Sequence, residues 1–308
     1  MERSKKQLFS DKKRSDYIFV YGIIAWPFLV WLFFFLLTNI ESIALAFEKI
    51  DVYGNTTFYA GNFKDAFDLI FRTKDSPLMT GFVNSLKYWF WTNVFCFPIT
   101  FTFSYLIWKK IYGFRIMRLV IMVPHVISGF VMTMIMKVFI NGPLVSVFQG
   151  VGLNVAMPLR NPQYTLGILI FYTCWSSFGF SCLMYSNAMK EIDESIVESY
   201  HIDGVSGMWS EIWHICLPGT FQTISTFIIT ASGSFLMTGG PLLAFYMYNA
   251  PTYVYSATYY FTLQIYNVGT NYSGYPVITA AGFMISFVTI PVVYLTRFLL
   301  NKYGPSEE

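Results

Sequence analysis

The sequence predicts an all-α integral membrane protein with about six transmembrane helices. Of its 308 residues, 55% are hydrophobic, 20% are aromatic and only 12% are charged, about half the charged share of an ordinary soluble domain. Several uncharged runs reach the roughly 20 apolar residues that are needed to cross the hydrocarbon layer. Lys and Arg gather beside these runs, as they do in membrane proteins.

The N-terminal region combines a basic tail with a long apolar block. Residues 1–16, MERSKKQLFSDKKRSD, carry six Lys and Arg side chains and form the predicted cytoplasmic tail. The apolar block at 17–40 is too long for a signal-peptide core and lacks a small-residue cleavage site. We therefore expect it to be retained as the first span of a membrane domain that covers 17–308.

Uncharged runs after residue 40 predict five more spans, at about 88–108, 116–140, 164–189, 220–236 and 277–299. The last two come from one stretch, Ile212 to Thr296, which contains no Asp, Glu, Lys or Arg and is longer than one span needs. The piece between them, 239–276, is rich in Tyr, Gly, Pro and Asn, which predicts an external loop with a short helix rather than a seventh span. The sequence leaves open whether 241–262 re-enters the membrane.

Basic residues predict the orientation of the spans. Four of them lie in the second connection, at Lys109, Lys110, Arg115 and Arg118, and this connection and the N-terminal tail are both expected in the cytoplasm. With six spans, both termini and the stretch around Glu198 face the same side. Because the basic residues lie beside spans, orientation explains them better than a nucleic-acid partner does.

The predicted spans carry no charge near their centres, where a proton relay, an ion path or a catalytic group would need one. Lys87 and Lys137 lie at span ends and are interpreted as interfacial anchors, and His125, with no acidic neighbour in sequence, as a packing residue. The four cysteines lack the spacing of a metal site or a disulfide framework. This pattern argues against a proton-coupled carrier and an intramembrane hydrolase, so the energy for any transport is expected to enter from outside the membrane domain.

A polar segment at 192–216 is predicted to form two cytoplasmic helices. Asp193 is placed to cap the first, which has an apolar face of Ile192, Ile196 and Tyr200. Gly204 then interrupts, and a second apolar face leads to Pro218 at the start of the next span. Periodicity alone favours equally a rigid arm that transmits a push from a soluble partner and an ordinary loop with an interfacial helix.

This segment resembles the EAA loop of ABC importer permeases, whose pattern is E-A-A, three residues, G, nine residues, I-x-L-P. The resemblance places eight residues in the ATPase-coupling loop: Glu198, Ser199, Tyr200, Asp203, Gly204, Ile215, Leu217 and Pro218. Two departures occur. Ser199 and Tyr200 replace the alanines, and ten residues rather than nine separate Gly204 from Ile215, which shifts the register of the second helix by about one position.

Four other segments are similar to the carbohydrate-uptake branch of this family: Gly61-Asn62-Phe63, Asn84-Ser85-Leu86, Thr238-Gly239-Gly240-Pro241, and Tyr275-Pro276 followed by Ala280-Ala281-Gly282. The tail RFLLNKYGPSEE lacks the V-K-G ending of the MalG-like permease, so the chain resembles the MalF-like half of a maltose-type transporter. The resemblance implies the MetI-like fold of type I importers, in a multi-pass permease of the bacterial cell membrane with both termini cytoplasmic.

The resemblance also implies the partners: a second homologous permease, two ATP-binding subunits, an extracellular solute-binding protein and a carbohydrate substrate. The chain has no Gly-rich Lys loop to cradle a phosphate, so ATP and Mg²⁺ are expected on the partner ATPase. No cofactor, no metal and no enzymatic activity are predicted for the chain itself.

Sugars are neutral ligands that aromatic faces and small polar groups hold. The candidate substrate cavity therefore comprises seven residues of the fourth and fifth spans: Tyr172, Trp175, Ser177, Phe178, Phe180, Ser232 and Ser234. Packing or lipid contact is the alternative role for each of them. The alternative functions are an ABC permease for another neutral solute and a nucleotide-independent membrane enzyme or scaffold.

Overall fold

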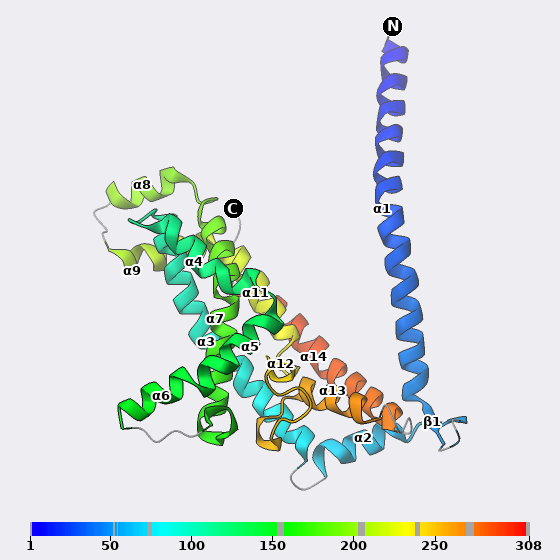
Figure 1. Cartoon of the computed structure of the whole chain (residues 1–308). Coiled ribbons are helices and arrows are strands. Elements are labelled where there is room, and N and C mark those ends of the chain that lie inside the picture. Colours follow the sequence, from blue (N-terminus) through cyan, green and yellow to red (C-terminus); the bar gives the residue numbers. More distant parts are fainter. Residues whose placement is uncertain are drawn as a thin grey trace.

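A computed structural model describes residues 2–51, 53, 55–72, 76–152, 157–202, 207–237, 241–268 and 274–305, with side chains at residue 17 and from residue 19 onward. The chain is built almost entirely from helices (Figure 1). The long ones are α1 (Glu2–Ala46), α3 (Pro77–Trp108), α7 (Pro162–Met189) and α14 (Tyr275–Tyr303). Between them lie α2 (Asn62–Phe71), α4 (Phe114–Val126), α5 (Gly129–Asn141), α6 (Pro143–Gly150), α8 (Glu194–Ile202), α9 (Met208–Glu211), α10 (Leu217–Gly219), α11 (Phe221–Gly233), α12 (Leu242–Tyr246) and α13 (Ala257–Val268).

The described chain also contains three short non-α helices and one β-hairpin. The short helices are the 3₁₀ helices η1 (Pro158–Arg160) and η3 (Thr252–Val254) and the π-helix η2 (Ile212–Cys216). The strands β1 (Glu48–Ile50) and β2 (Thr56–Phe58) pair antiparallel, with Glu48 opposite Phe58.

Five segments of the described chain are long and apolar enough to cross a membrane: Phe19–Ala46, Pro77–Trp108, Gly129–Gly150, Pro162–Met189 and Tyr275–Tyr303. A sixth candidate is the pair Met208–Gly219 and Phe221–Gly233, which is bent by 74° at the break between its two parts. At most 28% of the most apolar stretch of each of the five segments is buried, so their apolar surface is available to lipid. The chain is an all-α, multi-pass membrane protein, as the sequence predicted.

The predicted span at 116–140 corresponds to two helices rather than one. The helix α4 contains Pro124 in its last turn and ends two residues later at Val126, and Ile127 has an extended backbone. Gly129 then opens α5. The predicted spans at 88–108, 164–189 and 277–299 lie within α3, α7 and α14. The one at 220–236 starts one residue before α11 and runs three residues beyond it.

Close backbone packing joins α7 to its neighbours. The helix α7 packs along α3 on one side and α4 on another. At Gly179 a Cβ atom would lie 2.8 Å from the carbonyl carbon of Ile121 and 3.1 Å from the Cα atom of Met122. Only glycine allows α4 and α7 to approach this closely, because their backbones touch here.

Two asparagines hold the connections at the lower end of Figure 1. Asn62 is buried and donates from Nδ2 to the carbonyl oxygens of Ala46 (2.9 Å) and Glu48 (2.7 Å), which fixes α2 against the end of α1. Asn84 on α3 donates from Nδ2 to the carbonyl oxygens of Tyr253 (2.8 Å) and Tyr255 (2.9 Å). The Tyr-rich connection, which contains α12, η3 and α13, is thereby attached to α3.

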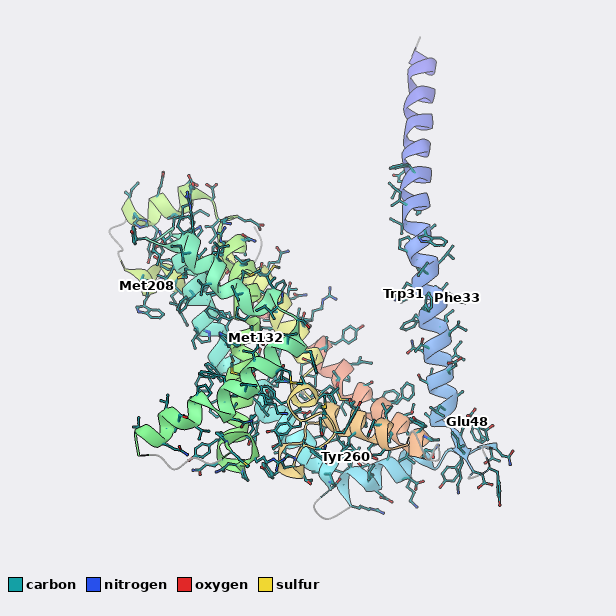
Figure 2. The ribbon with its side chains drawn as sticks, in the orientation of Figure 1. Trp31, Phe33, Glu48, Met132, Met208 and Tyr260 are labelled. Atoms are coloured by element: carbon teal, nitrogen blue, oxygen red, sulfur yellow. The ribbon has the colours of Figure 1, made fainter. Side chains whose placement is uncertain are left out.

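The helix α1 stands away from the other helices and joins them only near Ala46 (Figure 1). Trp31 and Phe33 project to opposite sides of α1 with no other helix against them (Figure 2), and they are 54% and 60% exposed. The N-terminal end of α1 and the α8–α9 region both lie at the upper end in this view.

Candidate functional site

The coupling segment, residues 193–219 as far as they are described, comprises α8, α9, η2 and α10 at one end of the molecule (Figure 1). Asp193 caps α8 as predicted, because its Oδ1 accepts a hydrogen bond from the backbone N–H of Ser195 (3.0 Å). That bond lowers the pKa of the Asp193 carboxyl, since it stabilises the ionised form. None of the residues of α8 is buried, so the whole helix is accessible to another molecule.

Tyr200 connects the helices α8 and α9 of the coupling segment. Its phenol oxygen lies 2.7 Å from the Ser210 hydroxyl in α9, and its ring stacks against His214 with centroids 6.4 Å apart. His214 in turn bonds through Nδ1 to the carbonyl oxygen of Ser210 (2.9 Å). The tyrosine that replaces an alanine of the EAA pattern therefore holds α8 against α9.

The π-helix η2 lies where the spacing of the EAA pattern is one residue too long. A π-helical turn closes i→i+5 hydrogen bonds and so holds one residue more than an α-helical turn. Ile212, Ile215 and Cys216 within it are buried. The extra residue between Gly204 and Ile215 can thus be accommodated without turning the apolar face of the segment away from the helix bundle.

Among the described residues of the coupling segment, Glu211 is the charged residue that is buried. Its side chain is 7% exposed and forms an ion pair with the Lys109 ammonium. The Tyr105 hydroxyl donates to its Oε2 at 2.6 Å. Both partners come from the end of α3, about 100 residues earlier in sequence, and Lys109 also lies over the Trp108 ring at 4.7 Å. The coupling segment is therefore bound electrostatically to a long membrane helix.

Sequence reasoning missed Glu211. The available signal was an acidic residue between Met208 and Ile212 on an otherwise apolar helix face, together with basic residues in a predicted connection on the same side of the membrane. Which of those basic residues meets Glu211 depends on the tertiary packing of α3.

Two hollows with mostly apolar walls and several polar side chains lie within the helix bundle. The central hollow, about 490 Å³ between α3, α7 and α11, is lined by polar side chains that include Thr92, Asn93, Ser177, Ser181, Thr230 and Ser234. The Tyr172 hollow, about 410 Å³ between α4, α5, α7 and the start of α12, is lined in part by His125, Thr133, Tyr172 and Ser177. Ser177 lines both hollows, so they lie on neighbouring sides of the same turn of α7.

Hydrogen bonds hold Tyr172 rigidly in its hollow. Its ring is buried and meets the Phe245 ring edge-to-face at 5.1 Å. Its hydroxyl lies 2.8 Å from the Thr133 hydroxyl and 3.4 Å from the Gly129 carbonyl oxygen. Such a rigid, hydrogen-bonded aromatic side chain is suited to orienting a polyhydroxyl ligand.

Several curated relatives of the chain are named as transport system permeases. It is 25% identical over 221 residues to Protein LplB of Bacillus subtilis (strain 168), covering 68% of this chain and 66% of that protein. It is 22% identical over 239 residues to the arabinooligosaccharides transport system permease protein AraP of the same strain, covering 75% of this chain and 72% of that protein. A third relative is the polygalacturonan/rhamnogalacturonan transport system permease protein YteP of the same strain. It is 24% identical over 196 residues, which cover 62% of this chain and 59% of that protein. No family model matches the sequence.

The fold matches that of a solved importer. A chain of a bacterial ABC transporter that imports the acidic polysaccharide alginate superposes with a TM-score of 0.75 at 21% identity, over 97% of this chain and 100% of that one. A second crystal structure of the bacterial alginate transporter, in complex with an alginate pentasaccharide-bound periplasmic protein, gives 0.73 at 22% identity, over 96% and 97%. This chain is a permease subunit of the carbohydrate-uptake ABC importers. It is a transporter subunit and not an enzyme.

The structure of the permease places the residues of the predicted coupling loop in different environments. Glu198 and Ser199 are exposed on α8, whereas Ile215 is buried in η2. Leu217 is half-buried and Pro218 is exposed in α10. Asp203 and Gly204 lie outside the described residues. The assignment of these residues to an ATPase contact stays a prediction.

The seven cavity candidates of the permease do not share one site. Tyr172 and Ser177 line the Tyr172 hollow, and Ser177 and Ser234 line the central hollow. The others, which line neither, are Trp175, Phe178, Phe180 and Ser232. Phe178 packs edge-to-face on Phe103 at 5.3 Å, and Phe180 stacks on His125 at 5.2 Å. Thr92, Asn93, Thr133 and Thr230 were not predicted, because polar residues within a span do not reveal which face of the helix they occupy.

Proposed function

We propose that this permease forms half of the transport path of an ATP-driven carbohydrate importer. The observation that carries the proposal is the Glu211–Lys109–Tyr105 cluster, which connects an accessible coupling segment to α3, a helix that lines the central hollow. A displacement of α8 and α9 would move α3, since a buried charge is costly to separate from its partners. Mechanical work done on the segment from outside could thus change the shape of the hollow.

The source of that work is a partner. In the proposed assembly, α8 and the exposed Glu198 and Ser199 contact one of two ATP-binding subunits, which hold ATP and Mg²⁺. In this proposal the chain itself binds no cofactor and no metal ion, and it corresponds to the MalF-like half beside a second homologous permease. The coupling segment and both termini are proposed to lie in the cytoplasm of a bacterial cell, which the basic residues beside α1 and α3 support.

A carbohydrate is the proposed substrate, delivered by an extracellular solute-binding protein. The hydroxyl and amide side chains in the mostly apolar walls of the two hollows, together with the Tyr172 hydroxyl, support a polyhydroxyl ligand. Relatives named for the transport of arabinooligosaccharides and of polygalacturonan or rhamnogalacturonan, and a structural neighbour that imports alginate, support the same class.

Purification of the permease from native membranes tests the assembly. A gentle detergent extract should contain a second permease and an ATPase, and its ATPase rate should rise when the binding protein and its sugar are added. A chain that purifies without either companion would contradict the proposal. The orientation is tested separately with Ser199→Cys, which an impermeant maleimide should label in inverted vesicles and leave unlabelled in intact cells.

A further inference from the structure

A third hollow, the basic hollow, lies at the opposite end of the molecule from the coupling segment, beside α6 (Figure 1). It measures about 750 Å³ and lies between the end of α5, α6, η1 and the residues that follow α12. Two cations line it, Lys137 and Arg160. Its other polar side chains are three amides and a phenol: Asn141, Gln149, Asn249 and Tyr246.

The two cations have no acidic counterpart nearby. The sequence contains no Asp or Glu from residue 76 to 190 or from 212 to 306, and none lines the basic hollow. Lys137 donates from Nζ to the carbonyl oxygen of Phe245 at 2.9 Å, which fixes the ammonium but leaves its charge. Neither cation forms an ion pair within the part of the chain that the structure describes. An anion from outside the chain would balance them.

One face of α5 connects the basic hollow with the Tyr172 hollow. Gly129, Thr133, Lys137 and Asn141 follow each other at intervals of four, which places them on the same side of the helix. The first two line the Tyr172 hollow and the last two line the basic hollow. A ligand that passes along this face would meet the cations first and the buried hydroxyls of Thr133 and Tyr172 next.

We propose that Lys137 and Arg160 form an anion subsite that binds the carboxylate of a uronate residue, so that the imported carbohydrate is an acidic oligosaccharide. This rests on the proposed carbohydrate function. A guanidinium binds a carboxylate through two parallel hydrogen bonds, and an ammonium adds a point charge. The three amide side chains both donate and accept, which suits sugar hydroxyls around the carboxylate. A lipid phosphate offers the same charge, but it would not use the hydroxyls that follow along α5.

Import by the complete transporter tests the subsite. The purified importer with its partners is placed in vesicles of phosphatidylcholine alone, and uptake of short oligomers of galacturonate, mannuronate and glucuronate is compared with uptake of their methyl esters, which keep the hydroxyls and lose the charge. In Lys137→Gln/Arg160→Gln, kcat/KM for the acidic form should fall about tenfold or more, because each lost charge-assisted hydrogen bond corresponds to at least that factor. Uptake of the ester should not change.

Two matched variants control for folding and for surface charge. Lys137→Arg/Arg160→Lys keeps both charges and should retain most of the uptake of the acid. Lys87→Gln removes a cation that lines a separate hollow beside α2 and should leave both forms unaffected.

Each other result would overturn the subsite. If the double glutamine variant lost uptake of the acid and of the methyl ester equally, the substitutions would have caused a general defect in transport. If the double glutamine variant lost uptake only in vesicles that contain phosphatidylglycerol, the ligand of the two cations would be a lipid headgroup. Uptake of neutral oligosaccharides without any uronate would reject the subsite and leave the proposed carbohydrate function standing, whereas uptake of neither class by an importer whose ATPase is active would reject both.

Discussion

Glu211 and Lys109 form an ion pair that joins the coupling segment to the end of α3, and the Tyr105 hydroxyl completes the cluster at 2.6 Å from the Glu211 carboxylate. The Glu211 side chain is 7% exposed and that of Lys109 is 31% exposed, so water reaches only one side of the pair. The pair therefore lies between the two extremes of a surface ion pair and a fully buried one. It marks the point through which the segment and the helix move together.

Glu211→Ala should lower the free energy of unfolding by about 1 to 3 kcal/mol, because it leaves the Tyr105 hydroxyl and part of the Lys109 charge without a partner. Thermal unfolding of the detergent-solubilised permease measures this effect. The double variant Glu211→Leu/Lys109→Met should recover much of the lost stability, because it leaves no unpaired buried charge. In the assembled importer, both variants should hydrolyse ATP without transporting the substrate. A double variant that is destabilised by the sum of the single effects would show that the two residues do not interact.

Tyr200→Phe should loosen α8, because it removes the hydroxyl that bonds to Ser210 and keeps the ring. The expected loss is about 0.5 to 1.5 kcal/mol, confined to the coupling segment, and hydrogen exchange of the amides in 194–202 should accelerate. Tyr200→Ala, which restores the small residue of the family pattern, should accelerate exchange further because it also removes the stacking on His214. Unchanged exchange in Tyr200→Phe would show that the hydroxyl does not hold α8.

Gly179→Ala should destabilise the helix bundle, because its Cβ would meet the carbonyl group of Ile121 in α4. Overpacking of this kind costs about 1 to 3 kcal/mol. Gly167→Ala on the same helix is the matched control, since its added Cβ would meet no atom within 4 Å apart from its chain neighbours and the backbone of its own helix, and it should be neutral or slightly stabilising. Melting temperatures of the two variants in the same detergent decide the question, and equal values would contradict the contact between α4 and α7.

Asn84→Leu should detach the Tyr-rich connection from α3, because both hydrogen bonds to the carbonyl oxygens of Tyr253 and Tyr255 are lost. We expect a loss of about 1 to 3 kcal/mol and easier proteolysis within 242–268. Asn93→Leu serves as a stability control, because among the described residues the Asn93 amide bonds to the Trp89 carbonyl oxygen of its own helix, at 2.7 Å. Resistance to protease equal to that of the unmodified chain would show that Asn84 is dispensable for the attachment.

Sequence reasoning was most effective where one helix sufficed for the argument. Membrane class, the long helices α3, α7 and α14, and the cap at Asp193 all follow from composition, periodicity and local hydrogen-bonding groups. It was weaker at 116–140, where Pro124 and the Ile127–Gly129 junction divide an apolar run into two helices. Hydropathy does not register such a break, because the residues at the junction are themselves apolar or small.

Hydrophobic content and the distribution of basic residues by themselves determined that this chain is a multi-pass helical membrane protein. Long uncharged runs can enter lipid because they carry no costly charge, and the backbone of such a run must be helical because its N–H and C=O groups find no water there. The tertiary structure decided which polar side chains meet: Glu211 with Lys109, Tyr172 with Thr133, and Lys137 with Arg160 around one hollow. These pairs are separated by between 23 and 102 positions in sequence. Their meeting depends on how α3, α5 and α7 cross, and close crossings such as that at Gly179 are set by side-chain shape across helices, which periodicity within a single helix does not contain.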